Sequence, residues 1–234
     1  MNIHDYYDKL NSSCQSIFES TIVDSESFGK VHYFSKCLFD FAENLNEKQE
    51  SDLLKVVCSQ IEVSALDVSF GLYRQAFSSL RLALEMGLGI VYFSAFKLDC
   101  YEWLRGGDIK WAKIIDSDNG VLSKRFSKAF FPELNDSMSY YHEKTVKVYR
   151  KLSEFVHGNY ETWEENGLVL SKNEELIQTY FEYFEIFRDI LLFSLCCRFL
   201  KLMSHTRIDS MPFVMEDLGH NEAIRIFLGG PKEA

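Results

Sequence analysis

Two side chains in the stretch VYRKLSEFVHG, Arg150 and His157, have types and a spacing that suit phosphate chemistry. Seven residues are nearly two turns of an α-helix, so both side chains would lie on one helical face, with Ser153 and Glu154 between them. A histidine that holds and releases a proton near neutral pH suits general acid–base catalysis. An arginine offers a fork of donors that can stabilise charge on a phosphoryl group.

The same two residues also have a purely structural interpretation. His157 directly precedes Gly158, and glycine is the residue that most often ends a helix. Free carbonyl groups and the negative end of the helix dipole gather there, and both favour a protonated imidazole. From spacing alone, His157 is therefore either a proton-transfer group or a helix cap.

A second pair of charges lies in the most apolar segment of the chain, residues 73–96. In the stretch SLRLALE, Arg81 and Glu85 are four residues apart and would be neighbours on a helix. Charges in such apolar surroundings need partners. They could pair with each other, or they could meet the strip that carries Arg150 and His157, and the sequence leaves both options open.

The remaining pattern is helical almost throughout. Apolar residues recur with the period of an α-helix, and proline is scarce, with 3 in the chain. Ser171 or Asn173 can cap the last long helix. The expected helices cover residues 3–20, 27–45, 47–71, 73–96, 133–157 and 173–203.

We therefore predict an all-α fold, a helical bundle with a long apolar central helix at 73–96. Residues 1–203 would form one domain. Residues 204–234 would be a short, peripheral C-terminal appendage with a short helix near 221–227.

The charge and the cysteine pattern of the chain argue against several classes of function. The net charge is −10, which makes the chain a poor general binder of nucleic acid, although residues 97–151 hold 11 basic and 8 acidic side chains. The six cysteines show no zinc spacing, so we expect free thiols in a reducing cytoplasm, with no metal and no cofactor. The apolar segments 76–96 and 186–203 contain charges that lipid would disfavour, and the N-terminus does not resemble a signal peptide.

The stretch YRKLSEFVHG resembles the signature of HEPN proteins, in which a spacer of four to six residues separates an arginine from a histidine. Here the spacer has six residues. The wider pattern GLYRQAFSSLRLALE…YEWLRGG…YRKLSEFVHG is similar to bacterial HEPN-like proteins, some of which belong to toxin–antitoxin and phage-defence systems. The resemblance covers about residues 50–203 and implies a HEPN-like helical bundle.

This resemblance implies a metal-independent endoribonuclease that acts as a toxin or antiviral effector. His157 would activate the RNA 2′-hydroxyl or protonate the leaving 5′-oxygen, and Arg150 would stabilise the phosphorane-like transition state. The implied partners are a second copy in a homodimer, an RNA substrate, and an antitoxin or another defence-system protein. The expected site is completed by the supporting residues Arg81, Glu85, Ser153 and Glu154 and the substrate-binding residues Lys147, Lys151 and Asn159.

One residue departs from the active members of that family. They often carry Asn, Asp or His directly after the arginine, whereas this chain has Lys151. An alternative is therefore a non-catalytic HEPN-like subunit that engages a partner protein or a nucleotide through the same face. A third interpretation is an unrelated helical protein in which His157 is only a cap.

Overall fold

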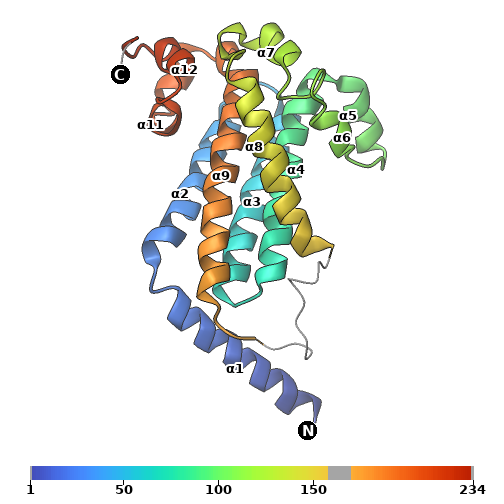
Figure 1. The fold of residues 1–234 in the computed structure, drawn as a ribbon, viewed down its shortest axis with the longest axis vertical. Coiled ribbons are helices and arrows are strands. Elements are labelled where there is room, and N and C mark those ends of the chain that lie inside the picture. The colour runs from blue at the N-terminus through green and yellow to red at the C-terminus, as the bar shows by residue number, and fades with distance from the viewer. Residues whose placement is uncertain (1, 158–169, 233–234) are drawn as a thin grey trace.

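The structure is a computed structural model that describes residues 2–157 and 170–232. Apart from α1 (Ile3–Thr21), its long helices run side by side along most of the molecule (Figure 1). The described parts of the chain contain helices and turns and no strand, so the all-α prediction is confirmed. The other long helices are α2 (Ser25–Glu43), α3 (Lys48–Ser69), α4 (Tyr73–Ala95), α8 (Met138–Val156) and α9 (Glu174–Phe199).

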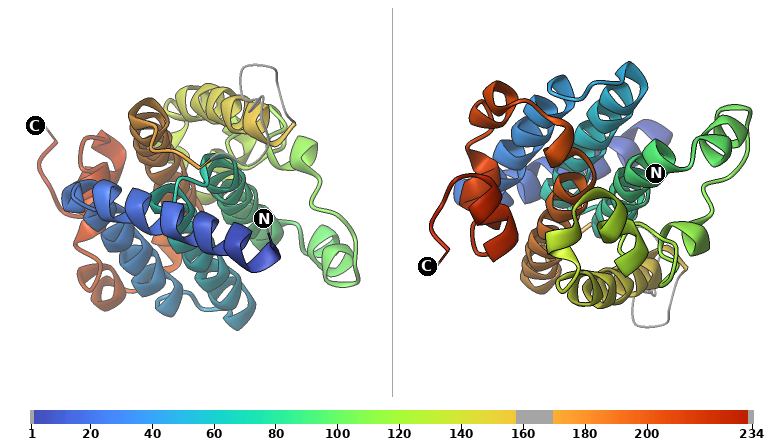
Figure 2. Two further views of the ribbon diagram at one scale, coloured as in Figure 1. Left: turned by 90° about the horizontal axis from the view of Figure 1, so that it is seen from below. Right: turned by 90° about the horizontal axis from the view of Figure 1, so that it is seen from above.

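Short helices gather at one end of the bundle, and α1 crosses the other end (Figures 1 and 2). Some of the short helices connect α4 to α8, and the others follow α9. Their bounds are α5 (Lys97–Leu104), α6 (Trp111–Ile114), α7 (Lys124–Phe130), η1 (Pro132–Leu134), η3 (Leu200–Leu202), α10 (His205–Asp209), α11 (Phe213–Leu218) and α12 (Glu222–Phe227).

The central helix is α4, which packs against α3, α8 and α9. It is long and apolar enough to cross a membrane by length and composition alone, but 67% of its most apolar window is buried inside the bundle. Gly87 lets α4 approach α9 closely, because a Cβ atom there would lie 2.6 Å from Cδ1 of Leu191. Burial against other helices therefore accounts for the apolar character of α4.

The expected helix 133–157 begins later than predicted. Pro132 opens only one turn of 3₁₀ helix, and α8 starts at Met138. Leu134 and Met138 are both fully buried, and the Ser137 hydroxyl accepts a hydrogen bond from the Asn221 side chain instead of capping α8. Packing of both segments on the core thus bends the chain between them.

The segment after residue 203 packs on the side of the bundle. It contains α12, at the position expected for a short helix, and also α10 and α11. Helix α11 packs against α9. The apolar side chains that it and its neighbours bury are Met211, Phe213, Val214, Leu218 and Ile224.

All six cysteines are free, as predicted, and five of them are buried. Burial raises the pKa of the Cys58 and Cys197 thiols to about 12, and it also raises the pKa of Cys196. The folded protein therefore holds protons on these thiols that the unfolded chain releases at lower pH. Their contribution to stability is present below the unfolded pKa and is lost as the pH rises.

We expect this linkage to appear in urea unfolding under reducing conditions. From about pH 7.5 to about pH 9.5, each of the three thiols should lower the free energy of unfolding by about 1 kcal/mol. In Cys58→Ala, the decline in the free energy of unfolding over this pH range should be smaller by about 1 kcal/mol. Ser59→Ala, an exposed change on the same helix that removes no titratable group, is the control and should leave the decline unchanged. A decline in Cys58→Ala equal to that of the wild type would contradict the assignment.

Candidate functional site

The C-terminal half of α8 divides its side chains between the core and the surface. Val148 and Leu152 are buried in the bundle, whereas Arg150 is exposed on the other side of the helix. His157 follows α8 as its cap residue, and its backbone N–H donates to the Ser153 carbonyl at 3.0 Å. The imidazole of His157 is exposed. Both residues of the expected catalytic pair thus lie at the surface, near the end of α8.

Neither of these two side chains has a polar partner within the part of the chain that the structure describes. Within residues 2–157 and 170–232, no hydrogen bond or ion pair joins Arg150 or the His157 ring to another group. Seven helical residues correspond to about 10 Å along the axis, so the two side chains are separated by nearly two turns. Both are free to contact a ligand at the surface of α8.

The supporting residues on this face have local partners. The Ser153 hydroxyl donates to the Tyr149 carbonyl at 2.7 Å, and Lys151 forms an ion pair with Glu154 at 3.2 Å. Ser153 and Glu154 therefore do not join Arg150 to His157. Lys147 is exposed, and Asn159 lies outside the residues that the structure describes.

The other expected pair, Arg81 and Glu85, meets α8 one residue away from Arg150. Nη2 of Arg81 lies 3.0 Å from Oε1 of Glu85, so the two charges pair with each other. The same Nη2 donates to the Tyr149 hydroxyl at 2.6 Å, and that hydroxyl donates to Oε1 of Glu85 at 2.7 Å. Tyr149, rather than Arg150 or His157, thus completes the arrangement. We call Arg81, Glu85 and Tyr149 the α4–α8 triad.

Aromatic contacts hold the triad and the end of α8 in place. The Trp111 ring stacks on Tyr149 with the ring centres 3.9 Å apart. Phe155, near the end of α8, stacks on Phe77 of α4 at 3.8 Å. Burial, together with the hydrogen bond to Glu85, raises the pKa of Tyr149. The phenol therefore stays protonated and keeps donating at neutral pH.

Sequence reasoning missed two members of this arrangement. Tyr149 directly precedes Arg150, but an i, i+7 comparison of polar residues passes over it. Trp111 lies 38 positions earlier and carries no local signal of the contact. Among the described residues, no group of three His, Cys, Asp or Glu side chains could hold a metal ion.

No family model, no curated protein and no solved structure matches this chain. The assignment of a function therefore depends on the geometry of α8 and on the resemblance of its residues to the HEPN signature.

We predict that Tyr149→Phe destabilises the protein by about 1.5–3 kcal/mol, because it removes two hydrogen bonds to charged groups. The matched control is Tyr140→Phe on the same helix, where the side chain is 61% exposed, and a change within about 0.5 kcal/mol is expected there. Urea unfolding monitored by circular dichroism measures both. Equal effects of the two substitutions would show that the triad does not anchor α8.

Proposed function

We propose that this chain is a HEPN-like, metal-independent endoribonuclease of the cytoplasm that acts as a toxin or antiviral effector. The observation that carries the proposal is the contrast between the charged side chains at the end of α8 and those of α4. Arg150 and His157 are exposed without a partner in the described chain, whereas the neighbouring charges of Arg81 and Glu85 are paired. Side chains that make no polar contact within the described chain remain available to contact a ligand.

In this proposal His157 takes the proton of an RNA 2′-hydroxyl. The 2′-oxygen then forms a bond to phosphorus, and the bond from phosphorus to the 5′-oxygen breaks. A protonated imidazole gives its proton to the departing 5′-oxygen, so the products are a 2′,3′-cyclic phosphate and a 5′-hydroxyl. Arg150 donates to the phosphoryl oxygens and stabilises the added negative charge of the transition state.

A second copy of the chain supplies the other half of this chemistry in the proposal. One imidazole must act as the base and another as the acid in the same turnover, and a single chain offers one His157 on this face. A homodimer that faces two α8 ends toward each other brings two Arg–His pairs to one cleft. Lys147 and Lys151 would lie beside the bound strand, so that a small basic cleft admits RNA to an acidic protein. Asn159, also expected to bind substrate, lies outside the residues that the structure describes.

The alternative is a non-catalytic HEPN-like subunit that binds a partner protein, such as an antitoxin, or a nucleotide. The observation that favours it is the ion pair of Lys151 with Glu154, which neutralises the residue after Arg150. Lys151 also stands where active family members often have a polar or imidazole side chain. The same exposed face would then bind without cutting.

Cleavage of a mixed RNA substrate in the presence of a chelator tests the proposal. Arg150→Ala and His157→Ala should each lower the rate by about 10²-fold or more, because each removes a group that acts in the transition state. Glu143→Ala, an exposed change on the same helix outside the proposed site, is the matched control and should leave the rate within about twofold of the wild type. The product ends should be 2′,3′-cyclic phosphate.

Stability measurements accompany the assay. All three positions are exposed, so each variant should unfold within about 0.5 kcal/mol of the wild type. Full activity in His157→Ala, or a wild-type protein that leaves RNA intact, would overturn the ribonuclease. Intact RNA together with stable co-purification of a partner through Arg150 would support the alternative.

A further inference from the structure

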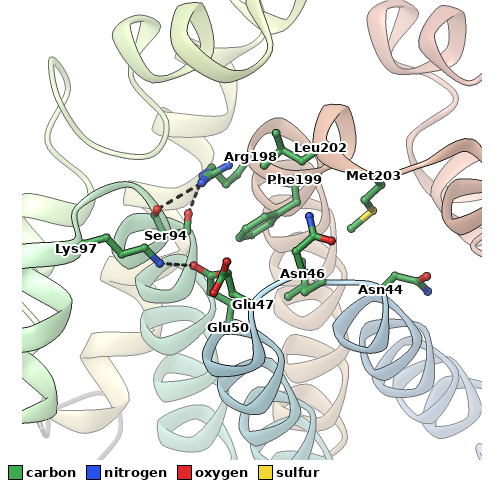
Figure 3. A pocket seen from close by; sticks show the side chains of 11 residues that line it. Asn44, Asn46, Glu47, Glu50, Ser94, Lys97, Arg198, Phe199, Leu202 and Met203 are labelled. Atoms are coloured by element: carbon green, nitrogen blue, oxygen red, sulfur yellow. Dashed lines mark hydrogen bonds and ion pairs between the residues drawn. The ribbon is translucent and has the colours of Figure 1, made fainter.

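A pocket of about 190 Å³ lies where α2 and α9 end, α3 begins and α4 leads into α5 (Figure 3). This end of the bundle is opposite to the one where α8 ends (Figure 1). Its volume has room for several water molecules and is below the range of pockets for drug-sized ligands. The polar side chains that line it include Asn46, Glu47, Glu50, Ser94, Lys97 and Arg198.

Arg198 is the central charged group of this pocket. Its Nε donates to the Ser94 hydroxyl at 2.7 Å, and its Nη2 donates to the Ser94 carbonyl at 3.3 Å. The guanidinium carbon lies 4.3 Å from the centre of the Phe130 ring and 5.0 Å from that of Phe199. These contacts fix the plane of the guanidinium group, and all of them are with uncharged groups.

No carboxylate of the described chain forms an ion pair with Arg198. The nearby carboxylate of Glu50 is buried and pairs with Lys97 at 2.8 Å (Figure 3). Burial lowers the pKa of Arg198, which reflects the unfavourable removal of its charge from water. The Glu50 carboxylate acts on Arg198 from a distance and favours its charge, but Glu50 is already paired with Lys97, so Arg198 has no ion-pair partner of its own in the described chain.

The start of α3 lies at the same pocket and brings backbone N–H groups there together with the acidic side chains of Glu47 and Glu50. Helix α3 has 22 residues, and its cap residue Glu47 makes no side-chain hydrogen bond to the first-turn N–H groups. Glu47 and Glu50 both line the pocket, so this helix end opens at it. The positive end of the helix dipole and the guanidinium of Arg198 thus act in the same small space.

We propose that this pocket binds a small anionic molecule whose carboxylate or phosphate group pairs with Arg198. The volume suits a ligand of metabolite size and is too small for a polymer strand. Asn46 and the Glu47 carboxylate offer hydrogen-bonding groups to the remainder of such a ligand. The site lies at the opposite end of the bundle from Arg150 and His157, so it stands independently of the proposed ribonuclease.

Inorganic phosphate and succinate, each compared with sodium chloride at equal ionic strength, are the probes for this site. Thermal unfolding and calorimetric titration of the wild type should show stabilisation by at least one of them beyond that of chloride. The comparison of the two probes distinguishes a phosphate-bearing ligand from a carboxylate-bearing one. No specific effect of either anion would overturn the proposal.

Substitutions place the effect at Arg198. Arg198→Gln should weaken binding by about tenfold or more, and Arg198→Lys should retain part of it, because lysine keeps the charge but not the fork. Arg188→Gln is the control on the same helix, where the arginine pairs with Glu185 and Asp217. Binding in Arg198→Gln as tight as in the wild type would overturn the assignment.

If Arg198→Gln does not fold, a second variant tests whether the pocket binds an anion. The Lys97 side chain is 52% exposed, so Lys97→Gln should fold, and it leaves the Glu50 carboxylate unpaired beside the pocket. That negative charge should repel an anion and weaken its binding by about tenfold. Unchanged binding in Lys97→Gln would contradict an anion site centred on Arg198.

Discussion

The packing of α8 on α4 depends on one constraint. Arg81 and Glu85 lie on an apolar face of α4, and their charged groups need hydrogen-bond partners there. An isolated ion pair at that depth would leave several donors and acceptors without partners. The Tyr149 hydroxyl meets both charges, at 2.6 Å and 2.7 Å, and brings α8 to a fixed position beside α4. The Trp111 ring covers the contact on the outer side.

This contact also fixes the rotation of α8 about its axis. Successive residues of an α-helix differ by about 100° in direction. With Tyr149 directed at α4, Val148 faces the core and Arg150 faces the surface. A rotation by one residue would direct Arg150 at Arg81, two like charges in contact, and would expose Val148. The exposure of Arg150 is therefore a consequence of how the charges on α4 are satisfied.

The periodicity of the sequence was sufficient to predict the long helices and the all-α class. Local signals also identified a helix start correctly, since the Asn173 side chain accepts a hydrogen bond from the Leu176 N–H at 3.1 Å. The contact of Tyr149 with Arg81 was not predicted, because it joins positions 68 residues apart and no local pattern specifies which helices become neighbours. The burial of α11 and the surroundings of Arg198 were missed for the same reason. Whether Arg150 and His157 cut RNA stays a prediction.

Helix α4 contributes residues both to the contact beside Arg150 and to the pocket around Arg198. Arg81 and Ser94 are thirteen residues apart on it, which corresponds to about 20 Å along a helix. Between them, Gly87 packs so closely on Leu191 that α4 and α9 have little freedom to slide past each other. Coupling between distant sites requires an element with two arrangements, and the close approach at Gly87 opposes a second arrangement of α4 against α9. An anion bound at Arg198 would therefore affect α8 by stabilising the bundle as a whole, rather than by moving Arg150.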